Sequence, residues 1–179
     1  MQYDVLFDAY ADAGYCDYLR KVDPCVPNMQ DDKASRPFVG VLLTVGSINY
    51  FAPLTSPKPK HKTMKNQIDF QKIKNGELGA INLNNMIPIH PYCLTVVDMN
   101  ILESDDKAEK DYKNLLVNQL SWCNSNKDEI LNKATRLYKM ITTGKAWPEL
   151  AKRCCNFSID EKQYQKYCAL HRLDMQTIK

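Results

Sequence analysis

Hydrophobic and polar residues follow two different periods along this chain, and the change between them falls near Ser104. Before that point, short apolar runs are separated by turn residues, which is the pattern of β-strands. The clearest strand is Pro37–Val45; Gly46 and Ser47 then predict a tight turn, and Ile48–Leu54 returns as the second arm of a hairpin. Shorter strands are predicted at Gln2–Phe7, Ile68–Ile73, Leu78–Asn82 and Leu94–Asp98, and a helix over Ala13–Val22.

The later part of the chain has the period of amphipathic helices, with apolar residues every three or four positions. One stripe covers Tyr112–Cys123 and a second covers Ile130–Ile141, and we assign both to core contacts. Capping residues in Ser125–Asp128 and a glycine at Gly144 bound the second helix, and a capping-box pattern at Ser158–Glu161 opens a last one.

Short strands followed by helices predict the α+β class. We expect a compact, strongly twisted antiparallel sheet or partly open barrel, with helices mainly in the C-terminal half. The 179 residues are 44% hydrophobic and 25% charged, which suits one globular domain over residues 1–179.

The seven cysteines form no recognisable disulfide or zinc pattern: their number is odd, Cys154 and Cys155 are adjacent, and no Cys-x-x-Cys pair occurs. The first ten residues carry Asp4 and Asp8 and lack the features of a signal peptide, and no apolar run approaches the ~20 residues of a membrane span. Free thiols in the cytoplasm are therefore expected. The three histidines are scattered, so no cofactor or structural zinc is expected.

Charge is distributed unevenly, although the formal net charge is only +3. Lys58–Lys74 holds six lysines and one histidine against a single acid, Asp69, whereas Glu103–Asp111 is rich in acids. This distribution fits an anionic partner bound on one face, and it equally fits a solvated lysine-rich loop.

The predicted strand Ile48–Leu54 leads straight into hydroxyl and cationic side chains. Thr55 and Ser56 are adjacent, and Lys58, Lys60, His61 and Lys62 follow, with prolines that predict a stiff, non-helical backbone. Hydroxyls beside positive charge suit a phosphodiester. Glycine-rich phosphate loops, Gly-x-Ser-x-Gly and His-Glu-x-x-His are missing from the sequence. RNA cleavage by its own 2′-hydroxyl needs mainly positioning and electrostatics, which such residues can supply without a metal.

Five segments in matching order resemble the ToxN/AbiQ/CptN family of endoribonuclease toxins from type III toxin–antitoxin systems, and similarity to the CptN branch is closest. They are Tyr-x-x-Tyr-Leu at Tyr15–Leu19, Val-Pro-Asn at Val26–Asn28, the stretch Arg36–Lys58, the stretch Leu78–Ile89, and Cys-Asn-Phe-Ser at Cys155–Ser158.

The resemblance implies a fold related to the MazF/Kid toxins and metal-independent, sequence-specific RNA cleavage that leaves 2′,3′-cyclic phosphate and 5′-hydroxyl ends. It also implies a small repeat RNA antitoxin, which the toxin processes. Each repeat folds as a pseudoknot that inhibits the toxin, commonly in a closed ring of three toxins and three RNAs. Cellular and phage mRNAs would be substrates, with abortive infection as the outcome.

Carried over residue by residue, the family's catalytic positions match Tyr15, Arg36, Thr55, Ser56 and Lys58. Arg36 stands where lysine is usual, so it keeps a phosphate-binding charge but loses an amine able to exchange a proton near neutral pH. Each residue also has a plainer explanation: Ser56 a Ser-Pro turn, Lys58 a solvated lysine, and Tyr15 helix packing.

The remaining basic residues near the loop are predicted to contact the RNA backbone, with His61 kept as an RNA contact rather than an acid or base. Asparagines of the Leu78–Ile89 stretch can read bases or serve turns. A non-catalytic RNA-binding module stays the alternative function, followed by a protein-interaction domain. The predicted RNA-binding residues are Lys33, Lys60, His61, Lys62 and Lys65.

Overall fold

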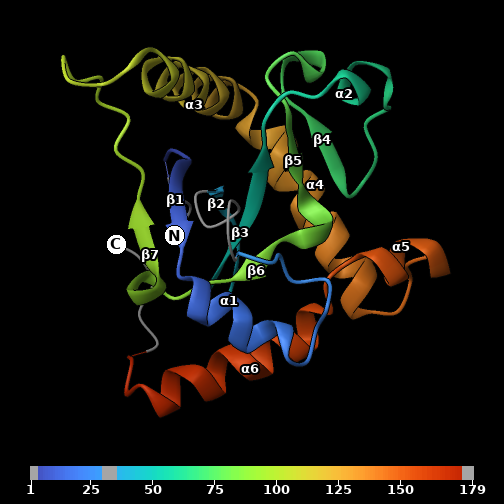
Figure 1. Ribbon diagram of the computed structural model, residues 1–179. Coiled ribbons are helices and arrows are strands. Elements are labelled where there is room, and N and C mark those ends of the chain that lie inside the picture. Colours follow the sequence, from blue (N-terminus) through green and yellow to red (C-terminus); the bar gives the residue numbers. More distant parts are fainter. Residues whose placement is uncertain (1–3, 30–35, 175–179) are drawn as a thin grey trace.

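An antiparallel sheet forms the centre of the computed structural model, which describes residues 4–29 and 36–174 (Figure 1). Within these residues the sheet has seven strands. They are β1 (Phe7–Ala11), β2 (Pro37–Val45), β3 (Ile48–Thr55), β4 (Phe70–Lys72), β5 (Ala80–Asn82), β6 (Ile87–Pro88) and β7 (Leu94–Val96). The strand order is β4-β5-β3-β2-β1-β7, with β6 paired to β3, and the sheet does not close on itself. The predicted α+β class and open antiparallel sheet are confirmed.

Most of the helical residues come after the last strand, as the periodicity predicted. The α-helices are α1 (Ala13–Arg20), α2 (Pro59–Thr63), α3 (Lys107–Ser125), α4 (Lys127–Thr142), α5 (Pro148–Arg153) and α6 (Phe157–Leu170). Short 3-10 turns are η2 (Lys74–Gly76), η3 (Leu83–Asn85) and η4 (Pro91–Cys93). Helix α4 packs against β2, while α6 packs against β6 and lies beside α1 (Figure 1).

The β2–β3 hairpin is the middle of the core. Gly46, with φ of +62°, closes the turn that the sequence predicted. The ring of Tyr50 on β3 lies edge-on to Tyr138 of α4 and Phe157 of α6. Both tyrosine hydroxyls donate to one carboxylate oxygen of Glu161, at 2.7 and 2.8 Å. Sheet, α4 and α6 are thereby joined at a single point.

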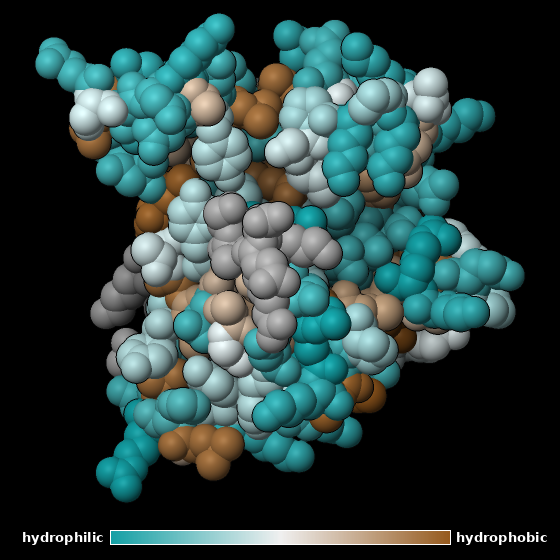
Figure 2. All heavy atoms as spheres, viewed as in Figure 1, coloured by the Kyte–Doolittle hydropathy of each residue, from teal (hydrophilic) through white to brown (hydrophobic). Residues whose placement is uncertain are grey.

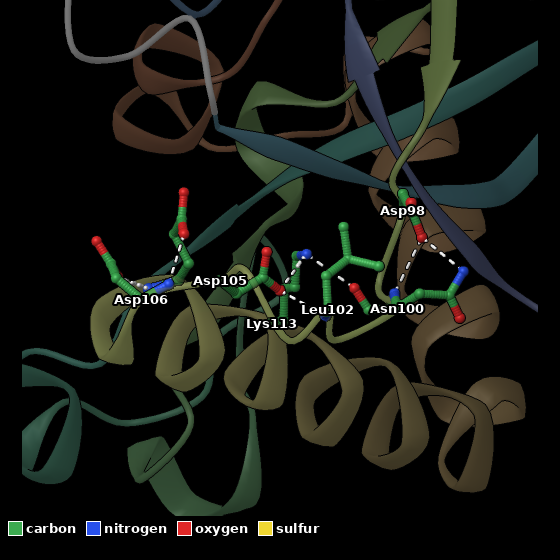
Figure 3. Close-up of polar contacts among 7 residues, drawn as sticks. Asp98, Asn100, Leu102, Asp105, Asp106 and Lys113 are labelled. Carbon is green, nitrogen blue, oxygen red and sulfur yellow. Dashed lines mark hydrogen bonds and ion pairs between the residues drawn. The ribbon is translucent and has the colours of Figure 1, made fainter.

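The acid-rich stretch after β7 organises the start of α3 (Figure 3). Asp106 accepts a hydrogen bond from the Glu109 backbone N–H, and Glu109 accepts one from the Asp106 N–H, both at 2.8 Å, which is a capping box. The Lys113 ammonium lies 2.6 Å from Asp105 and donates to the Asn100 carbonyl at 2.8 Å. These acids therefore serve local structure.

The first strand is not where the hydrophobic run predicted it. Residues 2 and 3 lie outside the described residues, Asp4–Leu6 are not in a strand, and β1 begins at Phe7. The strand begins at Phe7 because the backbone hydrogen bonds to β2 and β7 are made by residues of Phe7–Ala11, whereas Val5 stays exposed. Strands β4, β5 and β7 are present but shorter than predicted.

The prediction that the proline-rich loop is non-helical was wrong at Pro59, which begins α2. Proline suits the first helical position because its missing N–H needs no partner there. The last helix begins earlier than Ser158, since the Asn156 side chain accepts from the Ile159 N–H at 3.2 Å and caps it. Helix α5 and strand β6 were not predicted.

All seven cysteines are free thiols, as predicted. Across residues 4–29 and 36–174, the longest apolar helical stretch falls short of what a membrane span requires.

Candidate active site

A pocket of about 310 Å³ lies where the end of β3 meets α2, β4, β5, η3 and the end of α5. These elements occupy the right-hand side of Figure 1, and the same side is mainly hydrophilic in the space-filling view (Figure 2). Predicted site residues form one part of its lining: Arg36, Thr55, Lys58, Lys60 and His61. Polar residues from later in the chain form the rest: Gln67, Asp69, Asn82, Asn84, Asn85 and Arg153.

Thr55 is the last residue of β3 and is fixed through its backbone. It pairs with Ala80 of β5, and its carbonyl accepts a hydrogen bond at 3.2 Å from the buried Gln119 side chain of α3, which also donates to Leu78 at 2.6 Å. Gly79 approaches so closely that a Cβ there would lie 2.0 Å from the Thr55 oxygen. The Thr55 hydroxyl oxygen is buried and has no hydrogen-bond partner.

Lys58 is presented by the start of α2, and His61 holds that turn in shape. The Lys58 backbone N–H donates to Nδ1 of His61 at 3.2 Å, and the imidazole is tilted over Phe70 with ring centres 5.9 Å apart. His61 is only 2% exposed. Burial of the His61 ring lowers its pKa, and the positive charges of Lys58 and Lys60 lower it further, so the ring stays neutral at pH 7. Because Nδ1 accepts, Nε2 carries the proton. His61 therefore offers little surface to RNA and no free base at Nδ1.

Arg153, the last residue of α5, lines the pocket as part of an ion pair. Its guanidinium makes two contacts with Asp69, at 2.6 and 2.9 Å, and one with Gln67 at 2.9 Å. Asp69 is the one carboxylate among the described lining residues, and this ion pair occupies both of its oxygens. The pocket is consequently rich in cations and hydroxyl or amide groups.

Several predicted site residues lie outside the lining. Ser56 is exposed next to Thr55, and Lys62 and Lys65 are exposed around α2. Lys33 falls outside the described residues. Their RNA-contact and catalytic roles stay predictions.

Tyr15 is a core residue in this structure. It is fully buried in α1, its ring lies edge-on to Tyr167 of α6, and its hydroxyl donates to the Pro88 carbonyl at 2.5 Å. Burial raises the pKa of the phenol well above 10. Since Tyr15 does not line the pocket, the geometry favours the packing role that the sequence also allowed.

One group of potential metal ligands occurs among the described residues, and it is not in the pocket. Asp23, Cys155 and Asp160 are buried, with ligand atoms all within 4.8 Å of one another. Two backbone N–H groups, of Cys25 and Asn156, already bind Asp23. Burial raises the pKa of Asp160 to about 8, and the nearby negative charge of Asp23 adds to this effect. A proton on Asp160 therefore explains how the two carboxyl groups can lie so close together. The expectation of no cofactor stays a prediction.

Residues 9–165 match the family model of the ToxN toxin of type III toxin–antitoxin systems. The chain belongs to this family. Endoribonuclease ToxN of Pectobacterium atrosepticum is 33% identical over 86% of this chain and 88% of its own length. Endoribonuclease ToxN of Bacillus thuringiensis subsp. kurstaki is 34% identical over 86% of this chain and 79% of its own length.

Solved structures agree with this assignment. The structure of AbiQ, described as a lactococcal anti-phage endoribonuclease of the type III systems, superposes with a TM-score of 0.78 at 27% identity, over 92% of this chain and 99% of AbiQ. A structure concerning selective toxin inhibition by a non-coding RNA pseudoknot gives a TM-score of 0.75 at 29% identity, over 91% and 98%. The ToxN-family resemblance read from the sequence is confirmed.

Sequence reasoning missed Arg153, Asp69 and Gln67 as lining residues of this ToxN-family pocket, and it missed Gln119 as the residue that bonds the Thr55 carbonyl. The sequence did carry a signal for Arg153, because this residue stands just before the family segment Cys155–Ser158. Nothing in the hydrophobic pattern linked it to Asp69, which lies 84 positions away in the chain.

Proposed function

We propose that this protein is an endoribonuclease toxin that cuts RNA in the pocket at the end of β3. The observation that carries the proposal is the meeting of a hydroxyl without a partner, on Thr55, with the cations Arg36 and Lys58 around one pocket. The relatives named as endoribonucleases support it. Fixed hydroxyl and cationic donors are what a phosphodiester needs when its negative charge grows during attack.

The reaction is transesterification without a metal. The RNA 2′-oxygen attacks the neighbouring phosphorus, the bond to the 5′-oxygen breaks, and the products carry a 2′,3′-cyclic phosphate and a 5′-hydroxyl. Cleavage is specific for a short sequence. The donor set supports this chemistry, because the only carboxylate among the described lining residues is engaged by Arg153.

Each residue has a role that follows from its chemistry. Rotation about the Thr55 Cα–Cβ bond turns its hydroxyl toward a phosphoryl oxygen. Arg36 stabilises charge and is not a base, because a guanidinium stays protonated in proteins. The Lys58 ammonium orients the phosphate and can give a proton to the leaving oxygen. Ser56, exposed beside them, positions the attacking strand.

The partner is a small repeat RNA antitoxin folded as a pseudoknot. The related toxin structure described as inhibited by such an RNA supports this. We propose that the toxin processes this RNA and is inhibited by it in an alternating ring of three toxins and three RNAs in the cytoplasm. Freed toxin cuts cellular and phage mRNA and produces abortive infection. Native mass spectrometry of the complex gives the ratio, and unequal numbers of protein and RNA would contradict the ring.

Cleavage in the presence of EDTA, with mapping of the product ends, tests the mechanism. We expect cyclic phosphate and 5′-hydroxyl ends, and loss of cleavage with retained RNA binding in Ser56→Ala. No cleavage at all, or 5′-phosphate ends, contradicts the proposal. If Ser56→Ala behaves as the wild type and neither protein cuts RNA, the non-catalytic RNA-binding module is the better description.

A further inference from the structure

Arg153 enters the pocket with a side chain that is already held in place. Its Nε donates to Asp69 Oδ2 at 2.6 Å, and its Nη2 donates to Asp69 Oδ1 and to Gln67 Oε1, both at 2.9 Å. The Asp69 side chain is 5% exposed, whereas that of Arg153 is 39% exposed. The carboxylate therefore lies beneath the guanidinium and leaves its outer edge open.

The donors of Arg153 can be counted. A guanidinium has five N–H groups. Three of them bind Asp69 and Gln67, and the two on Nη1 have no partner within residues 4–29 and 36–174. The two Nη1 N–H groups point in different directions, and each can donate a charge-assisted hydrogen bond to a phosphate oxygen.

The backbone around Arg153 is tied to η3, which also contributes to the pocket lining. The Arg153 carbonyl accepts a hydrogen bond from the Asn84 side chain at 3.1 Å, and the Cys155 N–H donates to the Asn84 carbonyl at 2.8 Å. Because Asn84 also lines the pocket, α5 cannot move without moving η3. A cation held in this way loses little conformational entropy when it binds a ligand.

We infer that Arg153 binds a phosphate of the RNA strand next to the one held by Thr55 and Lys58, and that Asp69 is a positioning residue for its guanidinium. This inference rests on the proposed function. An RNA strand carries one phosphate per nucleotide, and Arg36, Lys58 and Arg153 all line the same pocket, so a strand bound there can place successive phosphates against different cations. Arg153 is thus a second phosphate subsite on the same strand.

Binding of a short single-stranded 2′-fluoro RNA of mixed sequence, which lacks the nucleophilic hydroxyl, tests this across a salt series. Arg153→Gln should weaken binding about ten-fold and lower the log–log salt slope by about 0.7. The matched control is Lys152→Gln, which removes one charge from the neighbouring exposed position on α5 and should leave both quantities unchanged.

Two further variants separate charge from position. Asp69→Asn keeps the cation but frees it, so the salt slope should not fall while kcat/KM for RNA cleavage does. Arg153→Lys keeps the positive charge but lacks the guanidinium donors, so it should retain the salt slope of RNA binding and lower the cleavage rate. This variant also tests the inference if Arg153→Gln fails to fold.

Equal affinity and slope for Arg153→Gln and Lys152→Gln, or wild-type cleavage by Arg153→Lys, overturns the inference. Its failure is distinct from failure of the proposed function. If only the inference fails, the wild type still cuts RNA; if the proposed function fails, the wild type does not cut RNA, whether or not it binds it.

Discussion

The Thr55 hydroxyl combines two features that usually exclude one another: it is buried, and it has no hydrogen-bond partner. An unpaired buried hydroxyl lowers stability by about 1 kcal/mol or more. The Thr55 backbone is held by β5, Gly79 and Gln119, so only rotation of the side chain can bring the hydroxyl to a partner. The phosphoryl oxygen that we propose for this site is a suitable partner for this hydroxyl.

Thr55→Val should therefore change stability and activity in opposite directions. Valine has nearly the same shape without the unpaired oxygen, so the free energy of unfolding should stay equal or rise by about 1 kcal/mol. Cleavage should fall about 100-fold or more, because a donor to the reacting phosphate is lost. Chemical denaturation and a cleavage assay measure the two effects.

The control for this variant is Thr44→Val. The Thr44 hydroxyl donates to Asn49 Oδ1 at 2.8 Å on the same hairpin, so this change should lower stability and leave cleavage intact. Reduced stability in Thr55→Val, with wild-type cleavage, would contradict the role that we give to the hydroxyl.

Helix α2 shows how a short element carries charge to a site. It has five residues, and Lys58 and Lys60 reach the pocket while His61 turns inward and fixes the first turn. Gly76 packs under it, because a Cβ there would lie 2.5 Å from the His61 carbonyl. The surroundings, rather than helix propensity, hold this element in place.

Changing Lys60 and Lys62 together to alanine should flatten the salt dependence of RNA binding by a log–log slope of about 1 to 2. Lys60 lines the pocket and Lys62 is exposed on the same helix. The single variants Lys60→Ala and Lys62→Ala therefore show how much each lysine contributes to the change in slope. Fluorescence anisotropy at several salt concentrations gives the slope, and an unchanged value would remove both lysines from the interface.

Long elements with a clear period could be predicted, whereas the two shortest α-helices could not. The β2–β3 hairpin and α3 and α4 follow from patterns that extend over many residues. Helices α2 and α5, with five and six residues, are too short to show a period. The Thr55–Lys58 part of the site is local in sequence and was predicted. The Asp69–Arg153 pair depends on contacts that only the folded chain creates.

At the scale of the whole molecule, α6 closes the fold over two buried carboxyl groups. Asp160 is fully buried, neither of its carboxylate oxygens accepts a hydrogen bond from the described residues, and it lies near Asp23. Burial is the main cause that raises the pKa of Asp160 to about 8, and Asp23 and Glu161 add to it. Cys155 is the other titratable group of the cluster, and burial raises the pKa of its thiol as well.

This arrangement predicts stability that falls as pH rises. Between the ordinary pKa of 3.8 and about 8, the folded state holds a proton on Asp160 that the unfolded state has lost. The free energy of unfolding should therefore decrease through this window by about 1 kcal/mol per pH unit, and level off above it.

Asp160→Asn should flatten that decline, since its amide can donate to Asp23 at any pH. Asp8, whose pKa burial raises to about 7, titrates in the same direction, so Asp8→Asn serves as the comparison and should remove a separate part of the slope. Urea unfolding from pH 5 to 9 measures this pH dependence, and an identical slope in Asp160→Asn and wild type would exclude the proton on Asp160.

The two sides of the pocket come from distant parts of the chain, Thr55 at the end of β3 and Arg153 at the end of α5. During translation, β3 leaves the ribosome long before α5 exists. A growing chain thus has no completed pocket until α5 has emerged. The order of elements therefore delays the RNA cleavage that we propose for this pocket, and with it any attack on the message being translated, until that helix has been made.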